Sequence, residues 1–460
     1  MKVVALDAGG ATLKASVVAP GVDPTVSILA NYVASTSANP TAVFMGQKLR
    51  ELERQRAKLR YLRPVQRGYC VNWNVESELW THLFTSTEML KVDPSEHALV
   101  VTAPLLAPTV VNESMDQVVF EELGFQAYAR VSAAESCVLS YSEFSEREFQ
   151  ESLKKPVKRS PGRKKREKGK TDPPTPPPVV DEDPLRFSTS SCHLVVDSGF
   201  SFTHVVPVID RKVYLPGVRR INVGGKLLTN YLKEIVSYRQ WNVMDDTPVI
   251  NELKEALCYC SLDFDNDLKR YHSDRQERKH WILPDFVRRF EGRCREDEEE
   301  VVTEEEEEEE EAAEEEASAD QQQPTRPTDD EQALEMGVEM ITVPEVLFNP
   351  SDIGLNQAGI AETIVQAVEA CPEELSDAFY ANILLVGGNT KFKNFKRRLE
   401  RDLRSLVPDD YDIELNEPSD PILAAWRGCC SLVESDALSG RVVTKQEYEE
   451  HGSNICLKRF

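Results

Sequence analysis

The chain has 460 residues, 40% of them hydrophobic, which suits two or more packed domains rather than one. Its net charge of −25 at pH 7 is mostly local, because residues 296–320 hold 17 acidic side chains and no basic one, and the acidic balance argues against non-specific binding to DNA. The ten cysteines contain no Cys-x-x-Cys pair and no apolar run approaches the roughly 20 residues of a membrane span, which excludes a zinc knuckle, a secreted disulfide framework and a transmembrane helix.

The first ordered block is predicted to cover residues 1–150. It opens with two strand-like segments, KVVALDAGG and ATLKASVV, and later contains a predicted strand, ALVVTAP, and a helix-like stretch, VNESMDQVVFEEL. Residues 151–186 follow as a basic, proline-rich segment that includes KKPVKRSPGRKKREKGK and PPTPPP. High charge with repeated proline cannot bury enough apolar surface to offset the entropy of ordering, so this segment is predicted to be a disordered insertion.

The second half of the chain repeats this organisation. Residues 187–295 begin with HLVVDSG and FTHVVPVI, and residues 296–335 are predicted to be an acidic, disordered insertion. Residues 336–421 contain a helix-like stretch, GIAETIVQAVEAC, a strand, NILLVGG, and helical spacing in KFKNFKRRLERDL. Residues 422–460 are expected to pack on the first half. Mixed strands and helices of this kind indicate an α/β fold with two similar halves.

A near-duplication links the two halves. Residues 3–10 form an apolar strand that ends in an aspartate and a glycine turn, and residues 194–199 repeat that order. Glycine lets backbone N–H groups approach an anion, an aspartate at the end of a strand suits hydrated Mg²⁺, and Lys14 can reach a phosphate oxygen. One such hairpin is most often a plain structural turn, but two of them can hold a phosphate from both sides of a cleft. The glycine pair Gly387 and Gly388 before a predicted helix adds a third anion-binding signal. Together these signals indicate a nucleotide cleft of the actin, sugar-kinase and Hsp70 type.

The sequence resembles the actin family over nearly all of its ordered parts. The segments VDSGFSFTHVVPV, PEVLFNPSDIG, GIAET, YANILLVGGNT and TKQEYEEHG follow the actin pattern in order. RINVGGKLLTNYLKE, SYRQWNVMDDT and LPDF are similar to the actin-related protein 6 branch. This resemblance implies an actin-like fold and a nuclear role as a subunit of an SWR-type remodeller that exchanges a core histone for its variant.

The resemblance also implies a nucleotide site for ATP or ADP with Mg²⁺, in a structural role. The residues carried over from the family come from the two hairpins, from a helix that faces the base and ribose, and from the glycine pair with a following aromatic ring: Asp7, Gly9, Gly10, Lys14, Asp197, Ser198, Gly199, Lys254, Glu255, Gly387, Gly388 and Phe392. Asp7 and Asp197 are expected to face the metal ion. For Lys254 and Glu255 taken alone, a solvated helix face is the plain alternative.

Several positions depart from the actin pattern. Ser136 stands where actin has a glutamine that orients the attacking water, and a serine is too short to hold that water. Phe200 and Ser201 replace an aspartate and a glycine in the second hairpin, while Ala8 and Ala11 replace a polar residue and a glycine in the first. We therefore expect retained nucleotide binding without efficient hydrolysis, and no catalytic residue.

The function expected from these features is that of a non-catalytic subunit in the nucleus, present also in the cytoplasm. Its expected partners are a Snf2-type ATPase and other subunits of the complex, with histones as further partners and nucleic acid contacted only indirectly or weakly. The alternatives are a filament-forming cytoskeletal ATPase and a small-molecule kinase of the same superfold. The basic segment from Lys154 to Lys170 is spaced like a nuclear import signal, and the acidic stretch 296–320 is suited to basic histone tails. Plain charged linkers are the alternative for both, and a nucleic-acid-binding arm is a further alternative for the basic segment.

Overall fold

The computed structural model describes residues 2–19, 21–37, 39–54, 59–154, 186–273, 277–285, 289–295, 332–435, 438 and 440–460. Most of the two predicted insertions therefore lies outside the described residues. The ends of both predicted ranges have regular structure, because helix α4 (Ala133–Lys154) covers residues 151–154 and strand β16 (Ala333–Met336) covers residues 333–335. No helix in the described part of the chain is both long and apolar enough to cross a membrane.

The first half is built on one mixed sheet. Its strand order is β19-β9-β8-β1-β2-β3, with β1 parallel to β8, β8 parallel to β9, and β1 antiparallel to β2. The bounds are β1 Lys2–Ala8, β2 Thr12–Val18, β3 Ser27–Ala30, β8 His97–Ala103, β9 Ala127–Ser132 and β19 Val443–Thr444. β1 and β8 are almost continuously apolar because helices cover both faces of the sheet.

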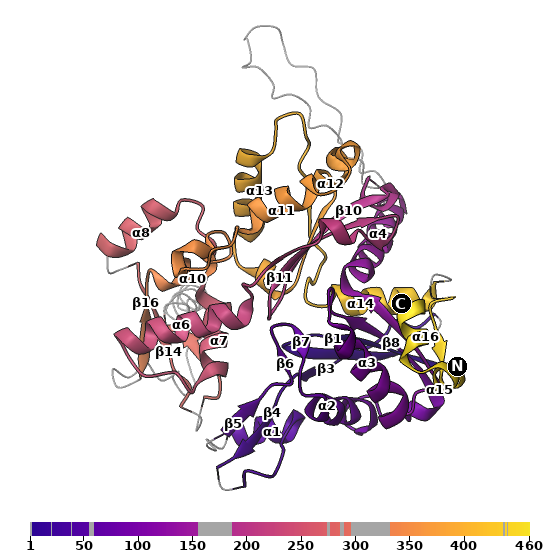
Figure 1. Ribbon diagram of the computed structural model, residues 1–460. Helices are drawn as coiled ribbons and strands as arrows, with labels where there is room; N and C mark the ends of the chain where they lie inside the picture. Colours follow the sequence, from indigo (N-terminus) through magenta and orange to yellow (C-terminus); the bar gives the residue numbers. More distant parts are fainter. Residues whose placement is uncertain are drawn as a thin grey trace, which may run out of the picture.

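The helices of this half come from both ends of the chain (Figure 1). They are α2 (Trp73–Thr85), α3 (Thr109–Gln117) with a π-helical continuation at Val118–Glu122, α4, and the C-terminal helices α14 (Ala424–Glu434), α15 (Lys445–His451) and α16 (Ser453–Arg459). α14 packs on α4 and on β1, and β19 pairs with β9, so the C-terminal segment lies against the first sheet. A small extension carries α1 (Gly46–Arg54), β4 (Val33–Thr36) and β5 (Leu59–Leu62), and the hairpin β6 (Val65–Gln66) and β7 (Tyr69–Cys70) follows it.

The second half repeats the first hairpin in its own sheet. The strand order is β12-β11-β10-β17-β18, with β13 paired to β11, and β10 is antiparallel to β11 and parallel to β17. The bounds are β10 Cys192–Ser198, β11 Thr203–Ile209, β12 Lys212–Val213, β13 Arg219–Ile221, β17 Ile383–Val386 and β18 Leu415–Asn416. α5 (Arg186–Thr189), α11 (Ile360–Glu369), α12 (Ser376–Tyr380) and α13 (Phe395–Leu406) pack around this sheet.

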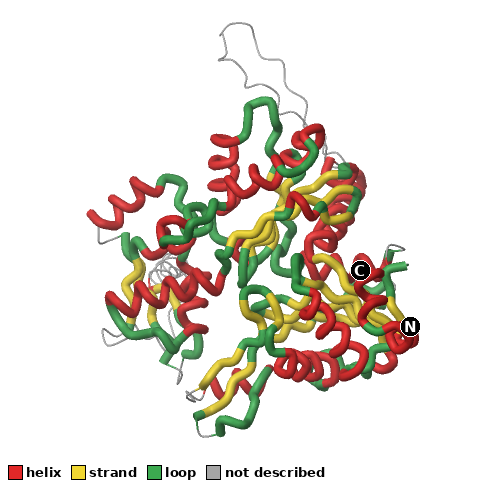
Figure 2. Tube along the Cα trace, viewed as in Figure 1, coloured by secondary structure: helices red, strands yellow, loops and turns green. Residues whose placement is uncertain are grey.

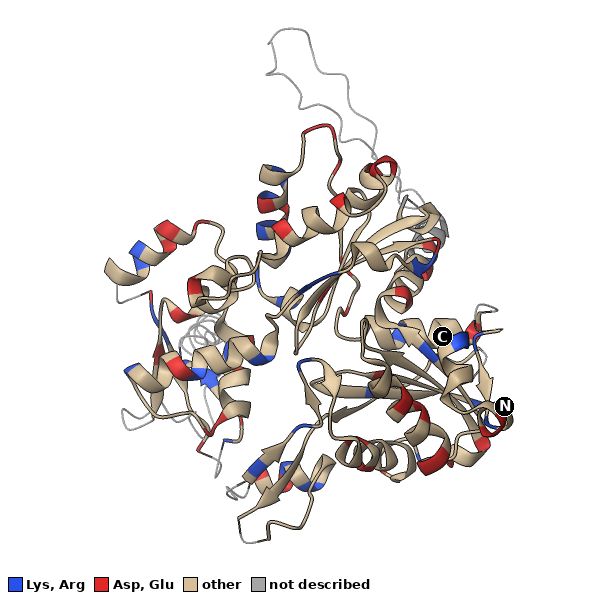
Figure 3. Cartoon of the chain, viewed as in Figure 1, with Lys and Arg blue, Asp and Glu red and all other residues tan. Residues whose placement is uncertain are grey.

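A smaller module extends from the second half. Its sheet has the order β15-β14-β16, where β14 is Lys279–Ile282 and β15 is Arg293–Cys294. Helices α6 (Gly225–Arg239), α7 (Thr247–Leu257), α8 (Phe264–Ser273) and α10 (Glu339–Glu345) belong to the same region of Figure 1. Figure 2 shows the strands of the two large sheets flanked by helices, and Figure 3 shows basic as well as acidic residues on both halves. The predicted α/β architecture with two similar halves is confirmed.

One predicted helix begins later than its spacing indicates. The helical pattern starts at residue 391, but α13 begins at Phe395. Asn394 has a φ of 67°, in the left-handed region, and a residue in that conformation cannot continue a right-handed helix. Residues Gly388–Lys391 instead form one turn of 3₁₀-helix that begins at the second glycine of the pair.

Candidate functional site: a cleft between two hairpins

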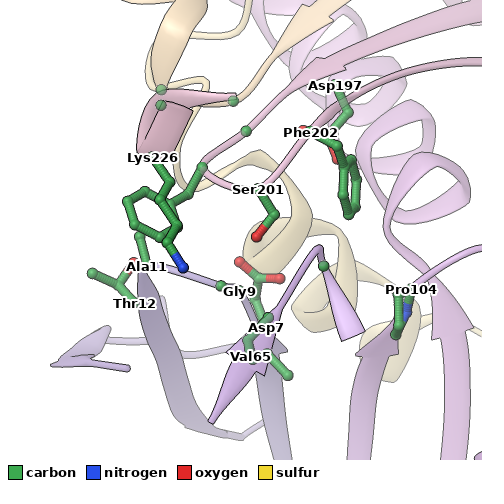
Figure 4. A pocket seen from close by; sticks show the side chains of 18 of the residues that line it. Asp7, Gly9, Ala11, Thr12, Val65, Pro104, Asp197, Ser201, Phe202 and Lys226 are labelled. Atoms are coloured by element: carbon green, nitrogen blue, oxygen red, sulfur yellow. The ribbon is translucent and has the colours of Figure 1, made fainter. Parts of the chain in front are cut away.

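The turns of the two repeated hairpins face one another across a cleft of about 1160 Å³ (Figure 4). The β1–β2 turn forms one wall and the β10–β11 turn the other, while α6, α7 and the segment after β17 complete the lining. Eleven of the twelve residues predicted to bind nucleotide line this single cleft: Asp7, Gly9, Gly10, Lys14, Asp197, Gly199, Lys254, Glu255, Gly387, Gly388 and Phe392. The fold therefore brings together residues that are as much as 385 positions apart in the chain.

The first hairpin presents a fixed carboxylate and a fixed amine. The register of β1 and β2 pairs Asp7 with Lys14, and the Lys14 amine donates to Asp7 Oδ2 at 2.8 Å. The Thr102 hydroxyl donates to Asp7 Oδ1 at 2.8 Å and accepts from the Ala8 N–H at 3.0 Å. Both carboxylate oxygens of Asp7 thus have partners, which fixes its orientation at the cleft.

The second hairpin has the same design with a different basic residue. β10 and β11 pair Asp197 with His204, as β1 and β2 pair Asp7 with Lys14. Burial and the nearby charge of Arg220 lower the pKa of His204 to about 4, so this imidazole is neutral at physiological pH. Burial and the charge of Asp7 raise the pKa of Asp197 to about 7. The seven-residue spacing from aspartate to basic residue is equal in both hairpins, and it could have identified His204 from the sequence.

Ser198 is the predicted residue that does not reach the cleft. Its side chain is fully buried, with its hydroxyl 2.9 Å from the Thr203 hydroxyl and 3.1 Å from the Asn389 amide nitrogen, which donates to it. Asn389 also donates to the Gly199 carbonyl at 2.8 Å. Asn389 therefore ties the second hairpin to the glycine pair after β17, a role that sequence reasoning missed.

Gly387 is required by the backbone at this junction. It has a φ of 93°, and a Cβ atom there would lie 2.3 Å from the Ser198 carbonyl oxygen. Only glycine combines that conformation with so close an approach. Gly387 thus packs directly against the end of β10. Gly388 follows it in the lining of the cleft.

The two hairpins approach each other closely at their tips. A Cβ atom built on Gly10 would lie 2.7 Å from the Ser201 hydroxyl oxygen and 3.8 Å from the Phe200 ring. In Figure 4 the Ser201 side chain points from the second hairpin toward Asp7 and Gly9 of the first. A phosphate group between the hairpins would therefore meet backbone N–H groups and a hydroxyl from opposite walls.

The predicted base-facing residues lie on α7. Lys254 is buried, and its amine donates to Asn251 Oδ1 at 3.0 Å, Thr229 Oγ1 at 3.1 Å and the Gly225 carbonyl at 3.4 Å. Burial lowers the Lys254 pKa from its ordinary value. Glu255 is exposed and accepts from the Asn251 amide at 2.8 Å. Asn251 thus orders both side chains, so that the amine is fixed in the wall and the carboxylate faces solvent at the cleft.

Two arginines join the halves across the cleft. Arg63, which follows β5, lies over the Tyr32 ring of its own half at 4.5 Å and over the Phe200 ring of the other half at 4.7 Å. Arg220 on β13 donates to the Tyr69 hydroxyl at 3.1 Å and to the Arg67 carbonyl at 2.8 Å, both on the β6–β7 hairpin. Phe200, where actin has an aspartate, thus forms a contact between the two halves.

Ser136 is turned away from the cleft. Its hydroxyl donates to the Ser132 carbonyl at 3.0 Å within α4, and its side chain is buried. A Cβ atom on Gly428 of α14 would lie 1.9 Å from the Ser136 carbonyl oxygen, so the two helices cross in direct contact here. The cleft lining contributed by α4 consists of Ala133, Ala134 and Cys137 among the described residues, and none of these side chains orients water as a glutamine amide does.

The paired aspartates fit a hydrated divalent cation. Asp7 and Asp197 project from opposite hairpins. They are close enough to each other that the charge of Asp7 raises the Asp197 pKa. A divalent cation between them would relieve this repulsion, and Mg²⁺ prefers oxygen ligands while keeping several waters. Among the described residues no group of three or more acidic, histidine or cysteine side chains forms a closed metal cage. The pair therefore suits a metal ion that is held jointly with nucleotide phosphates.

The Asp197 pKa makes metal–nucleotide binding dependent on pH. Because its pKa of about 7 is raised, Asp197 is largely protonated at pH 6 and ionised at pH 8, and only the ionised form favours a cation. We expect the affinity for Mg²⁺–ADP to rise about tenfold between pH 6 and pH 8, as measured by titration calorimetry. Asp197→Asn should bind more weakly and should lose this dependence; an equal pH dependence in the variant would assign the effect to the phosphates instead.

The chain is similar in sequence to known proteins over its whole length. A family model described as Actin matches residues 1–460. The chain is 35% identical to the actin-related protein 6 of Oryza sativa subsp. indica over 469 aligned positions, which cover 100% of this chain and 98% of that protein. It is 36% identical to the actin-related protein 6 of Arabidopsis thaliana over 86% of this chain and 85% of that one. It is 32% identical to the actin-related protein 6 of Drosophila melanogaster, with 98% and 97% covered.

Proposed function

Because this chain belongs to the actin family, within its actin-related protein 6 group, we propose that it is a non-catalytic subunit of an SWR-type nuclear remodeller that exchanges a core histone for its variant. The family's nucleotide cleft is retained, and bound ATP or ADP with Mg²⁺ has a structural role in this proposal. A ligand that binds only the folded state stabilises it by mass action, by about 2.7 kcal/mol at a hundredfold excess over its dissociation constant.

One observation carries the non-catalytic part of the proposal. The phosphate-binding hairpins are present, but the residue at the water-orienting position, Ser136, bonds within its own helix and is buried beneath α14. Positioning of the attacking water is much of what a protein contributes to phosphoryl transfer. The cleft is therefore suited to holding a nucleotide and poorly suited to cleaving one.

Pure protein should accordingly show no meaningful ATPase activity. We expect phosphate release from Mg²⁺–ATP to stay at the level of a matched Lys14→Met/Asp197→Asn variant, because both samples lack a water-orienting side chain. The measurement is a sensitive phosphate-release assay on protein freed of contaminating ATPases. A turnover rate like that of polymerised actin would contradict the proposal.

The same preparation tests the cytoskeletal alternative. Sedimentation with ATP and Mg²⁺ at concentrations that polymerise actin should leave this chain in the supernatant. Pelleted filaments, seen also by electron microscopy, would favour a cytoskeletal role instead. A phosphoryl-transfer screen against small hydroxylated substrates distinguishes the small-molecule kinase.

The chromatin role is tested by removing and restoring the chain. A purified remodeller that lacks this subunit should exchange the histone variant slowly, and recombinant full-length chain should restore the rate. An unchanged exchange rate without the subunit would oppose the proposal. We propose that the Snf2-type ATPase and neighbouring subunits are its direct partners. Nucleic acid is then contacted through them.

Nuclear localisation is proposed to depend on the basic segment. Residues 154–170 carry the clustered lysines and arginines of an import signal and lie almost wholly outside the described residues, so the sequence alone supports this proposal. Deleting 155–170 should move a fluorescent fusion toward the cytoplasm, where a smaller pool is expected in the wild type. Unchanged nuclear signal in cells that lack the complex would oppose it.

The acidic stretch is proposed to contact histone tails. Residues 296–320 present 17 acidic side chains, and such tracts attract basic chains in a salt-dependent way. Deleting 296–320 should weaken histone binding by the isolated chain at low salt. Equal binding by the deleted and full-length chains would exclude the contact.

A further inference from the structure

The end of α6 and the turn that joins it to α7 expose three large apolar side chains. Tyr238 is 91% exposed, Trp241 52% and Met244 44%. Their neighbour Val243 is buried in the core of the second half and anchors the turn. Residues 238–246 are called the Trp241 turn below. These three exposed apolar side chains occur within seven residues of one another.

Hydrogen bonds hold this turn in one conformation. The Val243 N–H donates to the Ser237 hydroxyl at 3.0 Å, which brings the start and the middle of the turn together. The Lys233 amine donates to the Met244 carbonyl at 3.3 Å and to the Thr247 hydroxyl at 2.8 Å. The apolar side chains are therefore displayed by an ordered backbone.

A second set of contacts, two hydrogen bonds and an ion pair, fixes the other edge of the turn. The Gln240 side chain donates to the Glu335 carbonyl at 2.7 Å and accepts from the Glu335 N–H at 2.7 Å. Arg239 forms an ion pair with the buried carboxylate of Glu339. These contacts tie the turn to β16 and α10. A surface that is ordered before binding loses little conformational entropy when a partner docks.

Exposed acidic side chains lie close to the apolar ones in the sequence. Glu234, Asp245 and Asp246 are exposed, and none of them has an ion-pair partner among the described residues. Burial and the charge of Asp245 raise the pKa of Asp246, so the two neighbouring carboxylates repel each other. A cation supplied by a partner would relieve that repulsion.

We infer that the Trp241 turn is a docking surface for a basic, amphipathic segment of a partner protein. Tyr, Trp and Met are enriched at protein interfaces, and Lys or Arg can pair with the acids while stacking on the aromatic rings. An acidic segment would meet three exposed carboxylates, two of which lie near the buried Lys233 amine. The inference goes beyond the proposed function, because it assigns a surface and a partner chemistry whichever complex the chain joins.

The test uses the full-length chain and a fluorescent 18-residue probe helix built from Leu and Arg with one apolar face. The acidic stretch 296–320 attracts any basic peptide, so the readout is the affinity of this probe relative to a scrambled peptide of equal composition. We expect the amphipathic probe to bind the wild type at least tenfold more tightly than the scrambled one. A version of the probe with Glu in place of Arg should not bind.

The matched variants are Trp241→Ala, Asp245→Asn/Asp246→Asn and, as a control, Leu406→Ala, which removes a 45% exposed apolar side chain at the end of α13. Trp241→Ala should abolish the preference for the amphipathic probe, and the double asparagine variant should reduce it and its salt dependence. Leu406→Ala should bind as the wild type does, and all variants should keep the wild-type melting temperature. Equal probe binding by Trp241→Ala and Leu406→Ala would overturn the inference. Self-association of the wild type that Trp241→Ala removes would do so too, by identifying a second copy as the occupant.

Discussion

Arg398→Met should lower the free energy of unfolding by about 3–5 kcal/mol, since it leaves a buried carboxylate without its partner. Arg398 is 6% exposed and Glu345 4%. Two guanidinium nitrogens of Arg398 donate to the two carboxylate oxygens of Glu345 at 2.8 and 2.9 Å. Arg398 also donates to Asp402 at 2.8 Å and to the Ser261 carbonyl at 2.8 Å. One guanidinium therefore joins α13, α10 and the segment before α8.

The measurement is urea unfolding followed by circular dichroism, with Arg401→Met as the matched control. Arg401 lies on the same helix and is exposed, and its one ion pair within the described part of the chain is with Asp402 at 3.4 Å, so its loss should cost less than about 0.5 kcal/mol. The double variant Arg398→Met/Glu345→Met should recover most of the lost stability, because it removes both charges and refills the space. Equal losses for Arg398→Met and Arg401→Met would show that the buried pair contributes no more than a surface one.

Glu76→Gln should stabilise the chain at pH 8.5 and leave it nearly unchanged at pH 5. Glu76 on α2 is 2% exposed, and its Oε1 accepts from the Trp80 indole at 2.8 Å and from the Asn31 amide at 3.4 Å. Its Oε2 has no hydrogen-bond partner among the residues that the structure describes. Burial raises the Glu76 pKa to about 7, from an ordinary value of 4.5. Asn31 also donates to the Gly9 carbonyl at 2.9 Å, so this carboxyl group lies directly behind the first hairpin.

The direction of this pH dependence follows from the raised pKa of Glu76. The folded chain binds the Glu76 proton more tightly than the unfolded chain does, so this stabilisation is complete below about pH 4.5 and is lost as the pH rises through about 7. The full loss is about 3 kcal/mol for a shift of this size. Glutamine carries no charge, so the variant does not lose stability as the pH rises. The difference in unfolding free energy between variant and wild type is measured at pH 5, 7 and 8.5, and Glu78→Gln, an exposed position on the same helix, is the control. A stabilisation of equal size at all three pH values would contradict this explanation.

The sequence predicted the hairpins because their signals are local. An apolar strand, an aspartate and a glycine turn occur within eight residues, and their repetition identified both walls of the cleft. The glycine pair before a predicted helix was a third local signal. The resemblance to the actin family then identified Lys254 and Glu255, and the match over residues 1–460 confirms that family. The contacts that assemble the site depend on tertiary structure and left no comparable signal. Thr102 and Asn389 act on residues 95 and 191 positions away.

Short strands and buried polar groups were harder to predict. β4, β5, β6 and β7 have two to four residues each, too few for a period of two to be recognised. Ser198 matched the phosphate-loop pattern, yet its position at the end of a buried strand directs its hydroxyl to Thr203 and Asn389. The role of Phe200 as a contact between the halves depends on Arg63, which lies 137 residues earlier in the chain.

The assembly role is tested most directly by affinity purification of the tagged full-length chain from nuclear extract, with mass spectrometry of the proteins that are retained. The account expects a Snf2-type ATPase together with histone-exchange subunits, in near-equal amounts with this chain and resistant to moderate salt. Recovery of cytoskeletal proteins alone, or of this chain without partners, would contradict the assigned function while leaving the actin fold unaffected.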